Sequence, residues 1–220
     1  MRQRQFLLPL LLTLAGCAEM RTPPPAAAPA GLAGRGGQPG EQVDPVRTAI
    51  VASAEAFADG GLSLAGKPDA VAQAAAQLEY LVSALPGMRA YAAMPDVTLR
   101  RLGLARTELR AALGIAEAAE PQAVMQALLA AARALRAGNP RDAAQALPAR
   151  LFRPGGSASV RRFAEPGPLP ETAAATALAR QDLGWIDTNQ LWLQGRPQDV
   201  IGMDIGQSPG GTAPGLGTGF

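Results

Sequence analysis

The sequence contains few side chains able to make or break covalent bonds. Its 220 residues include no histidine and a single cysteine, Cys17. The segment Gly155-Gly156-Ser157-Ala158-Ser159 comes close to the Gly-x-Ser-x-Gly turn that presents a nucleophilic serine. It lacks the last glycine, and the chain has no histidine to take the serine proton. We therefore interpret the segment as a flexible loop and predict no catalytic residue there.

Carboxylates are the remaining candidates for acid–base or metal chemistry. Glu55, Glu79 and Glu108 each fall in a predicted helix, where a solvent-facing glutamate is the common case. Glycan cleavage requires two carboxylates placed around the scissile bond, and a metal site requires clustered ligands. The residues therefore predict no metal site and no cofactor. A carboxylate-based cell-wall enzyme is the least favoured of three functional hypotheses for this chain.

Two arginines form a candidate binding surface. Arg106 and Arg110 are four residues apart, so they share one face of a predicted helix. There they could contact an anionic partner such as phospholipid, lipopolysaccharide or cell-wall carboxylates. The alternative is a solvated face whose charge is balanced by Glu108 and Glu117.

Trp185 and Trp192 are the two tryptophans of the chain. Their spacing of seven would place them on one face of a helix, although Asp187, Thr188 and Asn189 weaken the helical pattern between them. Tryptophan is enriched in binding hot spots, so both residues are candidates for a partner site. The favoured interpretation is that they attach the C-terminal segment to the rest of the domain, because aromatic residues are scarce in this chain and a packed core requires large side chains.

Prolines open most of the elements that must position these groups. Proline suits the first position of a helix, where no backbone donor is needed. Apolar residues in the second predicted helix recur at intervals of four and three, from Val71 to Leu85, which indicates an amphipathic helix. We expect the last helix to run from Pro170 to about Leu183. The predicted helices begin near Pro45, Pro68, Pro95, Pro121, Pro140 and Pro170.

The expected fold class follows from the composition and from the spacing of apolar residues. Alanine-rich segments favour helix, and runs of β-branched residues are almost absent, so no sheet is expected. Residues 44–194 are predicted to form an all-α domain, a compact bundle of about five to six short amphipathic helices. Residues 17–43 are rich in Pro, Ala and Gly and are expected to form a linker. Residues 195–220 are rich in Gly and Pro and are expected to form a disordered tail.

The first residues carry a targeting pattern. Arg2 and Arg4 precede an apolar run from Phe6 to Leu14, which is too short to span a bilayer. Leu14-Ala15-Gly16-Cys17 follows directly. A basic start, a short apolar run and a small-residue exit are typical of a secretory signal. Together these residues resemble the signal peptide and lipobox of bacterial lipoproteins.

The resemblance implies a processed and anchored protein. Residues 1–16 would be removed by cleavage between Gly16 and Cys17, and Cys17 would be acylated. In this family an aspartate just after the cysteine favours retention in the inner membrane. Ala18 stands at that position, so the resemblance implies the outer membrane, with the domain facing the periplasm.

Charge excludes one class of partner. The chain has 20 basic and 18 acidic residues, and loss of Arg2 and Arg4 with the signal would leave the two kinds equal in number. A neutral mature chain gives no electrostatic basis for binding nucleic acid.

Two further functional hypotheses follow. The first is a membrane-anchored envelope lipoprotein that acts as a non-catalytic accessory or interaction module for an envelope protein or the cell wall. The alternative is a lipoprotein that binds a hydrophobic ligand or peptide between its helices. A filled core with an exposed apolar patch would favour the first hypothesis, a large apolar cavity the alternative, and a cleft with two facing acids the cell-wall enzyme.

Overall fold

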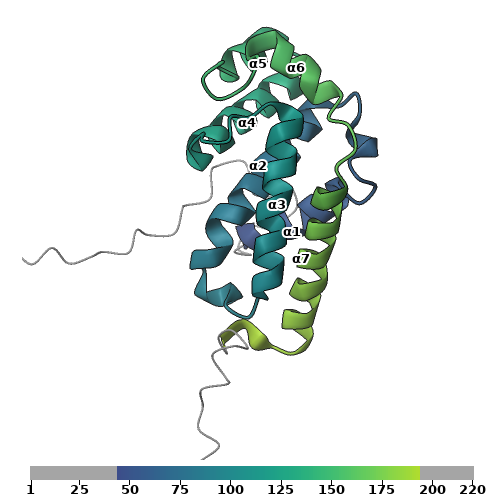
Figure 1. Cartoon of the computed structure of the whole chain (residues 1–220), viewed down its shortest axis with the longest axis vertical. Coiled ribbons are helices and arrows are strands. Elements are labelled where there is room, and N and C mark those ends of the chain that lie inside the picture. The colour runs from purple at the N-terminus through teal and green to yellow at the C-terminus, as the bar shows by residue number, and fades with distance from the viewer. Residues whose placement is uncertain (1–43, 194–220) are drawn as a thin grey trace, which may run out of the picture.

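The computed structural model describes residues 44–193, and within that range the chain is all-α with no β-strand (Figure 1). The predicted fold class is confirmed. The helices are α1 (Pro45–Ala56), α2 (Pro68–Ala84), α3 (Asp96–Leu113), α4 (Pro121–Arg136), α5 (Pro140–Ala146), α6 (Gly156–Ala164) and α7 (Pro170–Thr188). Single 3₁₀ turns are η1 (Leu62–Leu64), η2 (Leu85–Gly87), η3 (Arg89–Tyr91) and η4 (Leu191–Leu193). The predicted lipobox with Cys17, the linker over residues 17–43 and the tail over residues 195–220 lie outside the described residues.

Helix starts follow the local sequence. Proline occupies the first turn of α1, α2, α4, α5 and α7, as predicted. The Asp44 carboxylate accepts hydrogen bonds from the backbone N–H groups of Val46 and Arg47, which have no partner within the helix. Gly114 ends α3 in the left-handed conformation, with φ of 73°.

Helix α2 lies at the centre of the packing. It contacts α1, α3, α4 and α6, while α3 and α7 pack side by side, and α1 covers the other flank of α7 (Figure 1). Leu78, Tyr80 and Leu81 of α2 are almost completely buried. None of the helices between residues 44 and 193 is both long and apolar enough to cross a bilayer.

Helix α6 corrects the sequence interpretation. The sequence predicts a flexible loop from Gly155 to Ser159, but in the structure α6 begins at Gly156. Phe163 of α6 is fully buried and packs edge-to-face on Phe152, with ring centroids 6.0 Å apart. The buried Ser159 hydroxyl accepts a hydrogen bond from the Gly155 N–H at 3.0 Å. Packing of α6 against α2 and α5, with Phe163 in the core, therefore stabilises a helix that was not predicted from the local sequence.

Helix α7 is longer than predicted. It continues past Leu183 to Thr188, because its last turns are held from both sides. Leu183 and Ile186 are buried in the core, and Asp187 forms an ion pair with Arg47 of α1. These partners offset the weak helical preference of the residues around Asp187.

Candidate interaction surface

Arg110 is buried in the core, so the prediction that it shares an exposed face with Arg106 is wrong. Its Nε and Nη2 atoms donate to the two carboxylate oxygens of Glu79, at 2.5 and 2.8 Å. Nη1 donates to the backbone carbonyls of Glu117 and Ala119, at 2.7 and 3.1 Å. The arginine and the glutamate are 7% and 2% exposed. Such a pair is tolerated only when its hydrogen bonds are satisfied, so Arg110 has a structural role. Arg106 lies half-buried on α3.

Glu108, one of the candidate acids, caps another helix. Its carboxylate accepts hydrogen bonds from the backbone N–H groups of Glu171 and Thr172, at 3.2 and 2.7 Å, and from the Thr172 hydroxyl. The residue that precedes α7 is Leu169, which has no side-chain acceptor. Glu108 thus supplies from α3 the negative charge that the first turn of α7 favours.

The other two candidate acids also have structural surroundings. Glu79 is held by Arg110, and Glu55 is exposed with Arg180 at 3.7 Å. Across residues 44–193, no three potential metal ligands of the His, Cys, Asp or Glu type lie close together.

Trp192 attaches the C-terminal segment to the bundle, as the favoured interpretation expected. Its ring meets Tyr91 edge-on, with centroids 5.3 Å apart, and the Arg47 guanidinium lies 4.9 Å from its centroid. Arg47 also binds both carboxylate oxygens of Asp187, and the Tyr91 hydroxyl donates to Asp44. We call Asp44, Arg47, Tyr91, Asp187 and Trp192 the Tyr91 cluster. It joins the start and the end of the described chain.

The charges of the Tyr91 cluster alter its titration. Burial and the hydrogen bond to Asp44 raise the pKa of Tyr91 well above its ordinary value. The hydrogen bond from Arg47 lowers the pKa of Asp187. Both shifts favour the protonation states that keep the cluster bonded at neutral pH.

Trp185 has a different environment from Trp192. It is 46% exposed on α7, so it does not attach the chain to the core. The two rings do not share a helix face, because α7 ends at Thr188 and the backbone turns at Gln190, with φ of 53°, before η4.

Exposed apolar side chains gather where α3 and α7 meet. The large hydrophobic side chains exposed in the described region are Leu62, Val97, Leu104 and Trp185, with exposures of 68%, 49%, 57% and 46%. All but Leu62 belong to α3 or α7.

The hydrogen bonds between α3 and α7 fix how these side chains line up. The Thr98 hydroxyl donates to Asp182, and Glu108 reaches the start of α7, so the two helices run antiparallel. Val97 directly precedes Thr98, and Trp185 follows Asp182 by about one helical turn. Val97 and Trp185 therefore flank the same junction. Leu104 is seven residues after Val97, on the same side of α3.

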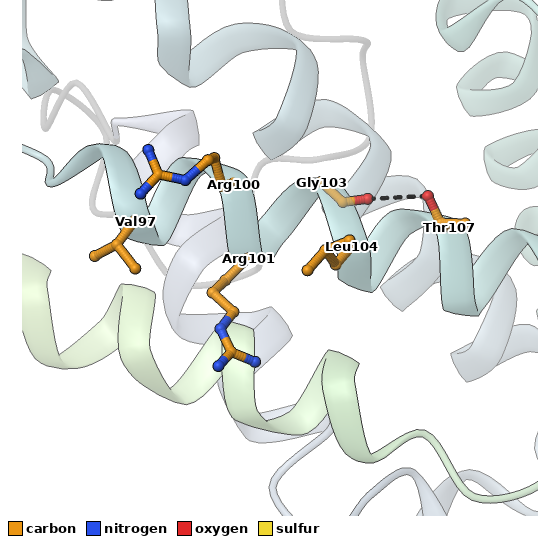
Figure 2. Close-up of a pocket in the computed structure, with 6 residues that line it drawn as sticks. All are labelled: Val97, Arg100, Arg101, Gly103, Leu104 and Thr107. Carbon is orange, nitrogen blue, oxygen red and sulfur yellow. Dashed lines mark hydrogen bonds between the residues drawn. The ribbon is translucent and has the colours of Figure 1, made fainter.

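A shallow hollow accompanies the exposed side chains. It has a volume of about 440 Å³, and its described lining belongs entirely to α3: Val97, Arg100, Arg101, Gly103, Leu104 and Thr107. Figure 2 shows Val97 and Arg101 extending toward α7, with Arg100 on the opposite edge of α3. A Cβ atom on Gly103 would meet nothing within 4 Å, so the missing side chain leaves this part of the surface open.

Two arginines frame the apolar side chains. Arg101 contacts Glu171 at 2.9 Å in an exposed ion pair. Arg100 is exposed, and none of the ion pairs formed within residues 44–193 includes it. We call Val97, Arg100, Arg101, Leu104 and Trp185 the α3–α7 face.

Of the four predicted partner-binding residues, Trp185 alone belongs to the α3–α7 face. The others are buried, half-buried or packed in the Tyr91 cluster. The sequence held a signal for Val97 and Leu104, since they fall outside the stripe that contains the buried Leu102 and Leu109.

No protein-family model, curated protein or solved structure matches this chain.

Proposed function

We propose that this chain is a membrane-anchored lipoprotein of the cell envelope, whose helical domain is a non-catalytic accessory or interaction module. The anchor would be Cys17 after cleavage behind Gly16, and the domain would face the periplasm from the outer membrane. The α3–α7 face would be the contact surface.

One observation carries the proposed contact surface. Three of the four large hydrophobic side chains exposed in the described region lie on neighbouring helices, around one junction. Scattered apolar residues are ordinary on a protein surface, whereas a grouped set flanked by charge marks an interaction site.

Two further observations weigh for an interaction module over the other hypotheses. The Glu79 carboxylate binds Arg110, and the Glu108 carboxylate caps the start of α7, so both groups are engaged in structural contacts. The hollow near Leu104 is lined by the outer side of a single helix, which suits contact with a surface.

A pair of photo-crosslinking substitutions tests the contact surface. A photoreactive amino acid at position 104 should give a discrete crosslinked product in intact envelopes, with either lipid or protein. The same group at position 62 is the control, because Leu62 is equally apolar, is more exposed and lies outside the α3–α7 face. Identical products, or none, at both positions would contradict the proposed surface.

A further inference from the structure

We propose that the α3–α7 face binds the surface of an anionic phospholipid membrane, with α3 and α7 against the lipid headgroups. The inference rests on the lipid anchoring proposed above and names the partner of the contact surface.

The apolar part of the face suits the boundary between headgroups and acyl chains. Trp185 has a large apolar ring with a polar N–H, and such rings concentrate at membrane–water interfaces. Val97 flanks the same junction of α3 and α7, Leu104 lies two turns further along α3, and both side chains are about half exposed. A membrane fits a shallow surface of this kind, because lipids adapt their packing to protruding side chains.

The charged part of the face suits phosphate. Guanidinium groups bind phosphate through two parallel hydrogen bonds, and Arg100 and Arg101 stand beside the apolar side chains. Glu171 pairs with Arg101, whereas none of the ion pairs formed within residues 44–193 includes Arg100, which is exposed and can reach a phosphate.

A second copy of the chain fits the face less well. Symmetric pairing would place the same surface on both partners, and would bring Arg100 and Arg101 toward the same arginines. Like charges at such an interface oppose association.

The position of the tether adds an independent argument. The chain enters the described domain at Asp44, which binds Tyr91, and Tyr91 precedes α3 by only a few residues. Arg47 pairs with Asp187, two residues beyond Trp185. The tether therefore joins the domain near the Val97 and Trp185 end of the α3–α7 face.

Because the tether is short, the α3–α7 face needs only a low intrinsic affinity for the membrane. Even fully extended, residues 18–43 reach no more than about 90 Å, so the anchored domain stays near the membrane. A tethered module acts at an effective concentration of about a millimolar, which allows Arg100 and three apolar side chains to hold the face on the membrane.

The test uses the acylated, full-length mature protein in vesicles whose acyl chains carry bromine near the headgroups. In phosphatidylethanolamine with phosphatidylglycerol, bromine should quench the tryptophan fluorescence, and Trp185→Phe should remove more than about half of that quenching, because Trp192 is packed on Tyr91. Leu104→Asp should reduce the quenching, whereas Leu62→Asp should leave it unchanged. Phosphatidylcholine vesicles should quench less.

A second measurement separates the face from the anchor. Unacylated Cys17→Ser protein without residues 1–16 should sediment with the anionic vesicles at low salt, and Arg100→Glu should weaken this partition by about tenfold. Failure of the wild type to take up fatty acid contradicts the anchor alone. Absence of both Trp185 quenching and salt-sensitive sedimentation overturns membrane binding by the face. So does a discrete protein crosslink at position 104 without quenching, which would assign the face to a protein partner.

Discussion

Arg110 and Glu79 show how much a single side chain depends on its surroundings. In the sequence, Arg110 belongs to a group of helical arginines that look solvated. In the fold, its guanidinium is enclosed, with Glu79 on one side and the backbone carbonyls after α3 on the other. Removing one member leaves the other charged, buried and unpaired, which is the costly case for buried ion pairs.

The first prediction concerns this ion pair. Arg110→Met should lower the free energy of unfolding by about 3–5 kcal/mol, because Glu79 would lose its partner. The double variant Glu79→Leu with Arg110→Met should recover part of that loss. Arg101→Met is the matched control, since its exposed pair with Glu171 is expected to contribute less than about 1 kcal/mol. Equal losses in denaturant melts of the two single variants would contradict a structural role for Arg110.

The second prediction is a pH dependence from the Tyr91 cluster. Because the pKa of Tyr91 is raised by folding, the folded chain retains a proton that the unfolded chain releases above about pH 10. Stability from this group is therefore present below pH 10 and falls as the pH rises further. Tyr91→Phe should make the alkaline fall in thermal stability shallower. Some fall should remain, because burial also raises the pKa of Tyr80. If Tyr91→Phe leaves the alkaline fall in thermal stability unchanged, Tyr91 is not its source.

At the scale of elements, α6 depends on close backbone contact at its start. Gly155 has φ of 90°, and a Cβ atom there would lie 2.8 Å from the backbone of Ala149. Gly103 lies within α3 and has open space around it. The two glycines therefore differ in what a methyl group would meet.

The third prediction compares these glycines. Gly155→Ala should destabilise the domain by at least about 1–3 kcal/mol, through both the left-handed backbone and the contact with Ala149. Gly103→Ala should stabilise it by about 0.5–1 kcal/mol, because alanine favours the helix interior. Thermal melts followed by circular dichroism measure both. A neutral Gly155→Ala variant would show that the start of α6 is not restrained in this way.

The fourth prediction separates the two tryptophans. Trp192→Ala should lower stability by about 1–3 kcal/mol, less than a fully buried aromatic, because it frees η4 from Tyr91. Trp185→Ala should change stability by no more than about 0.5 kcal/mol, as expected at an exposed position. The measurement is chemical denaturation of each variant. The reverse order would mean that Trp185, not Trp192, attaches the C-terminal segment.

At the scale of the molecule, the Tyr91 cluster brings the two ends of the described chain together. Asp44 and Arg47 at the start bond with Tyr91, Asp187 and Trp192. A chain that leads from an anchor to Asp44 would therefore join the domain close to the last turn of α7. This arrangement connects the proposed lipid anchor to the α3–α7 face.

The fifth prediction tests the anchor. Cys17→Ser should abolish incorporation of labelled fatty acid and release the protein from the membrane fraction, because stable anchoring depends on more than one acyl chain. Ala18→Asp, which keeps Cys17, should leave acylation intact and tests only the choice between membranes. A wild-type protein that takes up no label and fractionates as soluble would contradict the anchor.

Features that depend on neighbouring residues could be predicted from the sequence. Proline at the first turn of a helix and the stripe from Val71 to Leu85 act within a few residues. For that reason the all-α fold class and most helix starts could be predicted.

Which side chains are buried and which are exposed depends on tertiary packing. Glu79 and Arg110 are 31 residues apart, Glu108 and Thr172 are 64 apart, and Arg47 and Asp187 are 140 apart. No helical period encodes contacts at such separations, because they depend on how helices pack rather than on how they form. The same reason explains why Trp185 lies on the α3–α7 face while Trp192 packs on Tyr91.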